Sequence, residues 1–77
     1  MIKDGDKVLL EKFGAKLNEL RVKKKLSLRQ LSYLSNLDHS TIAKIEKGSI
    51  NITFTTLAEL ARALEVHPKE LLDIKFD

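Results

Sequence analysis

The chain of 77 residues is long enough for one small domain with a single hydrophobic core. It contains no cysteine, which excludes disulfide bonds, thiolate metal sites and catalysis by a cysteine nucleophile. The net charge is +3, and residues 1–48 hold eleven basic against six acidic side chains, which suits an anionic partner or, more simply, a solvated lysine-rich helix.

The first predicted helix runs from about Val8 to Lys25. Gly14 lies inside this helix and is expected to weaken it slightly. Residues 1–7 are expected to be frayed. Apolar positions recur at spacings of three and four residues, as in the buried stripe of an amphipathic helix. These positions are Leu10, Phe13, Leu17 and Leu20.

The second predicted helix covers residues 28–35. The sequence Ser27-Leu28-Arg29-Gln30 has the S-x-x-Q form of a capping box, in which two side chains satisfy free amides at a helix start. Leu31 and Leu34 are the expected core contacts. Asn36 tolerates the left-handed conformation that ends a helix and turns the chain.

The third predicted helix covers residues 39–47. Asp38 precedes it and is a favourable N-cap residue. Leu37 and Ile42 have the spacing of a hydrophobic staple, which fixes the direction in which the chain enters the helix. Gly48 supplies the C-cap, and two lysines in the last turn complement the helix dipole.

The rest of the chain predicts two further helices. A fifth helix begins near Pro68, a residue suited to a first helical turn, and buries Leu71, with Leu72 as a second candidate. Only the short stretch NITFT alternates like a strand. The fourth helix is capped by Thr53 and carries the core positions Leu57, Leu60, Ala61 and Leu64. The predicted fold is therefore all-α, a compact five-helix bundle in which residues 1–77 form a single domain.

The second and third helices, joined by a three-residue turn, form a helix-turn-helix. When Ile42 and Ile45 point inward, one outward face of the third helix carries small polar, small apolar and basic side chains. A face of this kind can enter the major groove of DNA and contact base edges. The residues of this face are His39, Ser40, Ala43, Lys44 and Lys47.

Residues 26–48, LSLRQLSYLSNLDHSTIAKIEKG, resemble the phage repressor/Cro-type (XRE-type) helix-turn-helix family, whose domains have the lambda-repressor-like fold. The following NITFTTLAELARALEVHPKELL is similar to the fourth and fifth helices of that family, so the resemblance covers most of the chain. The small size is most similar to restriction–modification controller proteins and stand-alone repressors. The resemblance implies a sequence-specific transcriptional regulator that binds double-stranded DNA.

The resemblance also implies roles for individual residues. It implies an ion pair between Arg21 on the first helix and Glu46 on the third. The family commonly has glutamine at the first residue of the second helix, where its amide meets the DNA backbone. This chain has Leu28 there, which cannot make that contact. The residues that match the family's base-contacting positions are His39, Ser40, Ala43 and Lys44, with Thr41 at the margin.

Further side chains are candidates for phosphate contacts. Partial burial is an equal alternative for Tyr33, and helix capping is the simpler role for Thr55. The run Lys23-Lys24-Lys25 is more typical of a solvated helix terminus than of a phosphate clamp. His39 beside Asp38 is also consistent with simple exposure. The phosphate candidates are Arg29, Gln30, Tyr33, Lys47 and Thr55.

Leu72, Ile74 and Phe76 are more apolar than a terminal segment requires. They either pack against the first helix or form the interface of a homodimer, as the resembled family often shows. A dimer would place two recognition helices about 34 Å apart, one turn of DNA, and so read a palindromic operator. The same residues favour the alternative function, a protein-interaction module that binds a partner such as a toxin or an antirepressor.

Other classes of protein find little support in the sequence. No segment approaches the roughly 20 apolar residues of a membrane span, and residues 1–10 lack the apolar core of a signal peptide, so we expect a cytoplasmic protein. His39 and His67 have no partner at ligand spacing, so neither a metal nor a cofactor is expected. No nucleophile–base set or glycine-rich phosphate loop indicates an enzyme.

Overall fold

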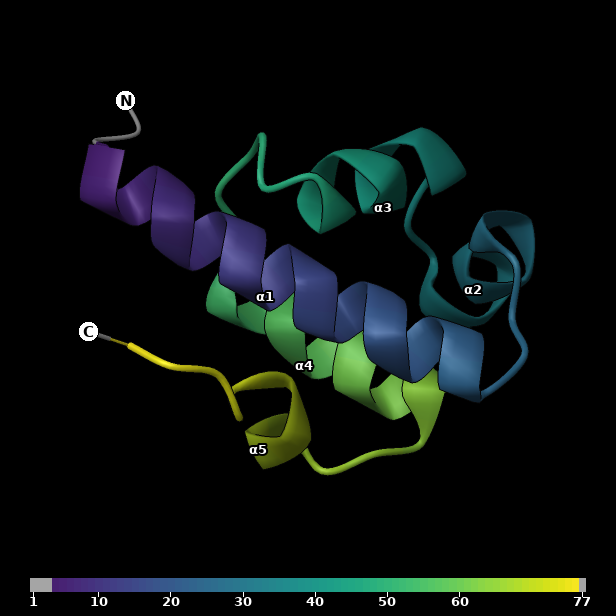
Figure 1. Cartoon of the computed structure of the whole chain (residues 1–77). Coiled ribbons are helices and arrows are strands. Elements are labelled where there is room, and N and C mark those ends of the chain that lie inside the picture. The colour runs from purple at the N-terminus through teal and green to yellow at the C-terminus, as the bar shows by residue number, and fades with distance from the viewer. Residues whose placement is uncertain (1–3, 77) are drawn as a thin grey trace.

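Five helices make up the structure, a computed structural model that describes residues 4–76 (Figure 1). No strand occurs within residues 4–76. The prediction of an all-α fold with five helices is therefore confirmed. The helices are α1 (Asp4–Lys23), α2 (Leu28–Ser35), α3 (His39–Glu46), α4 (Phe54–Leu64) and α5 (Pro68–Leu71).

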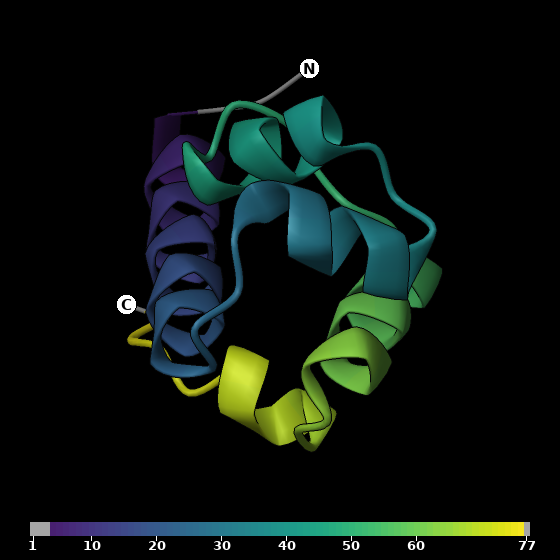
Figure 2. The ribbon, with the colours of Figure 1, turned by 90° about the vertical axis from the view of Figure 1, so that its right-hand side faces the viewer.

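The helices form a closed ring around the hydrophobic core. Helix α1 packs against α3, α3 against α2, α2 against α4, α4 against α5, and α5 again against α1. Figure 2 shows this ring, with α3 and α5 on opposite sides of it. The arrangement gives every helix one face toward the core and leaves α3 with one face toward solvent.

The core side chains come from all five helices and are aliphatic apart from one phenylalanine. Three of the four predicted positions on α1 are buried, and Leu10 is half-buried. Every predicted core position of α4 is buried. The buried hydrophobic residues are Phe13, Leu17, Leu20, Leu31, Ile42, Ile45, Leu57, Leu60, Ala61, Ala63, Leu64 and Leu71.

Two predicted core residues are exposed. Leu34 is 49% exposed and Leu72 is 42% exposed. On α2 the inward direction is set by the fully buried Leu31 and Ser35, and one residue along a helix is a rotation of about 100°. Leu34 therefore lies at the side of the buried face, where it is about half exposed. Leu72 follows the last residue of α5 and lines a surface hollow instead.

Helix α1 differs from its prediction at both ends. It begins at Asp4, four residues before the predicted start near Val8, while residues 1–3 lie outside the described residues. An ion pair of Lys7 with Glu11, one turn apart on the exposed surface, supports this first part of the helix. The helix ends at Lys23 because Lys25 takes a left-handed conformation with φ of 60° and closes the last turn.

The predicted caps of α2 are present. Ser27 Oγ accepts the Gln30 N–H at 3.0 Å, and Gln30 Oε1 accepts the Ser27 N–H at 2.8 Å, so both halves of the capping box are formed. Asn36 ends the helix with φ of 60°. These local bonds fix the start and the end of α2 at the predicted residues.

The caps of α3 are only partly as predicted. Asp38 occupies the N-cap position with an extended backbone, but its carboxylate makes no capping hydrogen bond and instead accepts a hydrogen bond from the Ser40 hydroxyl. Gly48 does close the other end with φ of 73°. The helix itself ends at Glu46, one residue before the predicted end at Lys47.

Glycine is required where α1 and α3 approach each other. A Cβ atom on Gly14 would lie 2.4 Å from the carbonyl oxygens of Ile45 and Glu46. A Cβ atom on Gly48 would lie within 2.7 Å of Glu11. The backbones of the two helices therefore meet closely at these glycines, which fixes the position of α3 on α1.

Candidate nucleic-acid interface

Helices α2 and α3 form the helix-turn-helix with a turn of three residues (Figure 1). The left-handed Asn36 donates its N–H to the carbonyl of Ser32 at 3.2 Å and reverses the chain. Leu37 then packs against the core between the two helices. Ser35 is fully buried, and its Oγ accepts the N–H of Leu37 at 3.3 Å. The turn is thus held by hydrogen bonds between residues close in the sequence and by one apolar side chain.

Helix α3 has one buried face and one open face. Ile42 and Ile45 are 0% and 2% exposed and hold the helix to the core. The sequence-predicted groove residues lie on the remaining surface, but to different extents. Ser40, Lys44 and Lys47 are exposed, whereas His39, Thr41 and Ala43 are half-buried.

Ala43 is half-buried because it lies beside α1 and the start of α2. It lines a shallow hollow together with Ala15, Asn18 and Leu28. Leu28 packs against the core, so its side chain contributes apolar surface beside α3 instead of the amide that the resembled family has there.

The start of α3 carries a hydrogen bond that sequence reasoning missed. Ser40 Oγ donates to Asp38 Oδ2, and His39 Nδ1 lies 3.8 Å from Asp38 Oδ1. The hydrogen bond from Ser40 and, to a smaller degree, the charge of His39 hold the pKa of Asp38 below its ordinary value. Asp38 remains an ionised acceptor at the exposed edge of the helix. The spacing of an acid and a serine two residues apart was the available signal.

The predicted phosphate candidates are exposed, and two of them already have partners. Arg29 and Gln30 lie in the first turn of α2, with Gln30 Oε1 used in the capping box. Tyr33 is 78% exposed, which excludes its partial burial. Thr55 lies in the first turn of α4, 3.0 Å from the hydroxyl of Thr53, the residue that caps the helix.

An ion pair joins α1 to the end of α3. Arg21 Nε donates to Glu46 Oε2 at 2.7 Å, and a second guanidinium nitrogen reaches Oε1 at 3.1 Å. Asn18 also donates to Glu46 Oε1 at 2.9 Å, and Arg21 donates to the carbonyl of Leu26 at 2.8 Å. The hydrogen bonds to Glu46 raise the pKa of Arg21 above its ordinary value, against a smaller effect of burial. The two-point contact fixes the orientation of α3.

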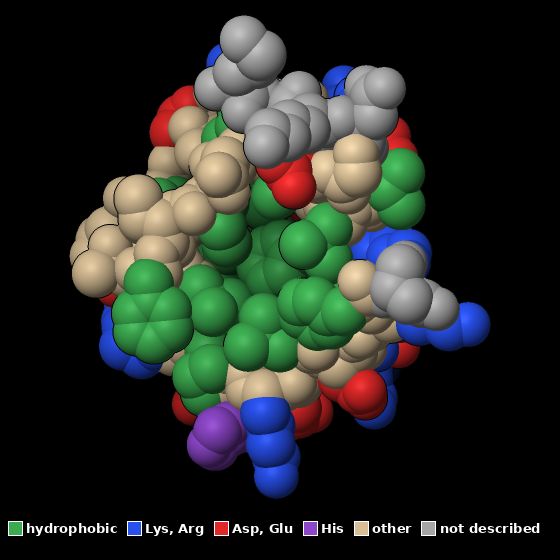
Figure 3. Space-filling model, turned by 90° about the vertical axis from the view of Figure 1, so that its left-hand side faces the viewer, with side chains coloured by type: hydrophobic (Ala, Val, Ile, Leu, Met, Phe, Trp, Pro, Cys, Tyr) green, Lys and Arg blue, Asp and Glu red, His purple; other side chains and the backbone are tan. Residues whose placement is uncertain are grey.

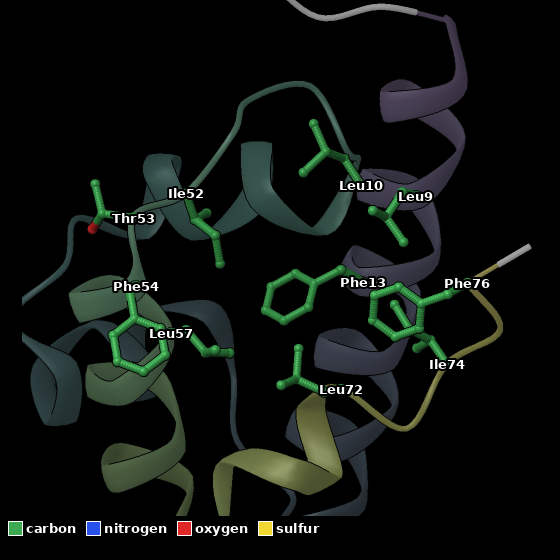
Figure 4. A pocket seen from close by; sticks show the side chains of 10 residues that line it. All are labelled: Leu9, Leu10, Phe13, Ile52, Thr53, Phe54, Leu57, Leu72, Ile74 and Phe76. Atoms are coloured by element: carbon green, nitrogen blue, oxygen red, sulfur yellow. The ribbon is translucent and has the colours of Figure 1, made fainter.

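A separate apolar surface lies away from α3. Figure 3 shows hydrophobic side chains gathered around a hollow, and Figure 4 shows that they come from α1, from the start of α4 and from the C-terminal segment. Phe54 is 82% exposed and Phe76 63% exposed. We call this surface the apolar hollow. Its lining residues are Leu9, Leu10, Phe13, Ile52, Thr53, Phe54, Leu57, Leu72, Ile74 and Phe76.

The three predicted interface residues all line the apolar hollow. Leu72 and Phe76 are exposed, while Ile74 packs against the core. Lys12 Nζ donates to the carbonyl of Lys75 at 2.9 Å and ties the segment to α1. Sequence reasoning missed Phe54, although its spacing of three residues from Leu57 placed it on the same side of α4.

Within residues 4–76, every helix is too short or too polar to span a bilayer. No group of three or more metal-ligating side chains comes together among residues 4–76.

Comparisons with known proteins agree with this geometry. The model of the family described as helix-turn-helix matches residues 17–71. The control protein C.BamHI of Bacillus amyloliquefaciens is 34% identical over 62 residues, which cover 79% of this chain and 76% of that protein. The crystal structure of the restriction–modification controller protein C.AhdI from Aeromonas hydrophila is 42% identical, with a TM-score of 0.82 over 83% of this chain and 97% of that chain. The clp gene regulator ClgR from C. glutamicum is 28% identical, with a TM-score of 0.79 over 83% of each chain.

Proposed function

This chain belongs to the helix-turn-helix family of DNA-binding transcriptional regulators, and we propose that it reads a specific operator by placing residues 39–47 in the major groove. The observation that carries the proposal is the two-faced character of α3. Its isoleucines are buried, whereas Ser40 and Lys44 are exposed on the open side. The ion pair of Arg21 with Glu46 supports the proposal because it holds this open side in one orientation.

Base contacts come from the open side of α3 in this proposal. Lys44 donates to guanine or to a phosphate, and Ala43 meets a thymine methyl group. His39, Ser40 and Thr41 lie nearest the start of the helix and contact base edges there. Arg29, Gln30, Tyr33, Lys47 and Thr55 are the proposed phosphate contacts, and the free amides at the starts of α2 and α3 can add to them.

We further propose that the chain binds as a homodimer through the apolar hollow. A large exposed apolar surface rimmed by polar residues is typical of a protein interface. Phe54 and Phe76 are aromatic residues of the kind that anchor such interfaces, and both are exposed. A two-fold dimer would present two α3 helices to a palindromic operator. The alternative occupant of the same surface is a different protein, as in an interaction module.

The relatives favour a narrower role for the regulator. C.BamHI is named a control protein and C.AhdI a restriction–modification controller protein, and this chain covers most of each. We propose that this chain likewise controls genes of a restriction–modification system. A regulator of this kind acts where the genome is, so a cytoplasmic location is expected.

Selection of bound duplexes from a random DNA pool tests the operator proposal. A two-fold symmetric motif is the expected result, and affinity for it should fall steeply with salt because phosphate contacts release counterions. Lys44→Ala should weaken binding to the selected site by about 1–3 kcal/mol. Lys69→Ala is the matched control, because it removes the same charge from α5 on the opposite side of the ring (Figure 2). Equal affinity of Lys44→Ala and the wild type for that site would refute the assignment.

A further inference from the structure

The exposed side chains at the start of α3 offer hydrogen-bond acceptors, which limits the bases that they can contact. Resting on the proposed function, we propose that Ser40 and Asp38 form an edge that only accepts hydrogen bonds and that selects a base with an amino group in the major groove, adenine or cytosine. The inference concerns a choice among bases and goes beyond the statement that Ser40 meets a base edge.

The Ser40 hydroxyl already uses its one proton in a hydrogen bond. Ser40 Oγ donates to Asp38 Oδ2, two residues earlier. An ionised carboxylate has no proton to give, so the single hydroxyl proton must lie in this bond. The lowered pKa of Asp38 agrees with its being ionised at neutral pH. Ser40 therefore offers only its lone pairs to any third group.

Both residues are exposed where they could meet a base. Ser40 is exposed, and the side chain of Asp38 is 65% exposed. Asp38 makes no capping hydrogen bond to α3, and its carboxylate keeps acceptor capacity beyond the hydrogen bond from Ser40. An edge of two neighbouring acceptors is thus open at the N-terminal end of the helix, the end that reaches base edges in helix-turn-helix proteins.

The four bases present different hydrogen-bonding groups to this edge. In the major groove, adenine presents its N6 amino group and cytosine its N4 amino group as donors. Guanine presents N7 and O6, and thymine presents O4, all of which are acceptors. When two acceptors face each other, neither receives a hydrogen bond, although both have lost their hydrogen bonds to water. This costs more binding free energy than the absence of a contact. An amino group is therefore the partner that this edge favours.

The carboxylate of Asp38 increases the selectivity among bases. It repels phosphates, so Asp38 weakens binding to every duplex and is compensated only where a donor lies opposite. The positive N-terminal end of the α3 dipole lowers the cost of holding the charge there. The pair of Ser40 and Asp38 thus contributes to selectivity more than to affinity.

Duplexes with single functional groups removed test the inference. The probes are the selected operator carrying purine in place of adenine or pyrimidin-2-one in place of cytosine, which deletes one amino group at a time. Matched duplexes with 7-deazaadenine or 7-deazaguanine delete one acceptor, N7, at a time. Wild type, Ser40→Ala and Asp38→Ala are titrated with each duplex, after thermal melting shows that each variant is folded.

At one position in each half-site, loss of the amino group should weaken wild-type binding about 2- to 12-fold, the range of one net hydrogen bond. The same loss should weaken Ser40→Ala binding less, because only the Asp38 carboxylate then remains to accept from the amino group. Asp38→Ala frees the hydroxyl proton and should lose most of the preference for an amino group over an acceptor at that position. A double-mutant cycle isolates this coupling from the general weakening of the duplex.

Two results would overturn the inference while leaving the proposed function intact. One is coupling of Ser40 to a deleted N7 acceptor. The other is an equal response of wild type and Ser40→Ala to every amino deletion. Failure of the proposed function is a different result, since the wild type would then enrich no motif from the random pool.

Discussion

Gly14→Ala should destabilise the protein even though alanine is the better helix former. In an open helix this substitution stabilises by about 1 kcal/mol. Here the new Cβ atom would lie 2.4 Å from two carbonyl oxygens of α3, and contacts below 3.0 Å essentially never occur. The end of α3 would have to move by at least the difference, 3.0 minus 2.4, or 0.6 Å.

The expected loss follows from these opposing effects. Overpacking of a tight contact costs typically 1–3 kcal/mol, and backbone atoms yield less easily than a flexible side chain, so we expect about 3 kcal/mol. Subtraction of the propensity gain leaves a net loss of about 2 kcal/mol. In a domain of this size such a loss lowers the melting temperature by roughly 8–16 °C.

Thermal unfolding followed by circular dichroism measures the effect, with all samples at one protein concentration because self-association would shift the midpoint. Gly5→Ala is the matched control, since it lies in the same helix and nothing is within 4 Å of its new Cβ atom. Gly5→Ala should be as stable as the wild type or slightly more stable. A Gly14→Ala protein at least as stable as the wild type would refute the close approach of α1 and α3.

Three further predictions concern the ion pair, the start of α3 and the apolar hollow. Glu46→Ala should cost about 3–5 kcal/mol in urea unfolding, because it leaves the mostly buried Arg21 without its partner; a loss below about 1 kcal/mol would contradict this. Because the pKa of Asp38 is lowered on folding, its carboxylate stabilises the fold above its ordinary pKa of 3.8 and stops doing so as pH falls through the lowered value. The stability difference between wild type and Asp38→Ala should therefore shrink on acidification from about pH 5 to pH 3, and a constant difference in urea midpoint would argue against it. Phe54→Asp should prevent self-association in sedimentation without unfolding the monomer, since Phe54 is 82% exposed; an unchanged dimer would exclude this part of the hollow from the interface.

Features that depend on neighbouring residues were predictable from the sequence. The capping box of Ser27 and Gln30 and the left-handed Asn36 set the limits of α2, because each is satisfied by bonds within a few residues. Gly48 likewise marked the end of α3 to within one residue. The exposed side of α3 followed from the burial of its isoleucines.

Features that depend on distant elements were not predictable in the same way. From the sequence, Gly14 was predicted only to weaken α1. The carbonyl groups of α3 that require a glycine there are more than thirty positions away in the sequence. Leu34 was wrongly placed in the core because the small Ser35 takes the inward position. The capping bond expected of Asp38 is absent because Ser40 competes for its carboxylate.

The shortest helix has the widest consequence for the fold. Helix α5 has only four residues, yet it stands between α4 and α1, and Leu71 on it is 0% exposed. Its detachment would open the circle of packed helices and expose to water the core that supports the open side of α3. Unfolding should accordingly be all-or-none, so that a probe placed anywhere in residues 4–76 reports on the integrity of α3.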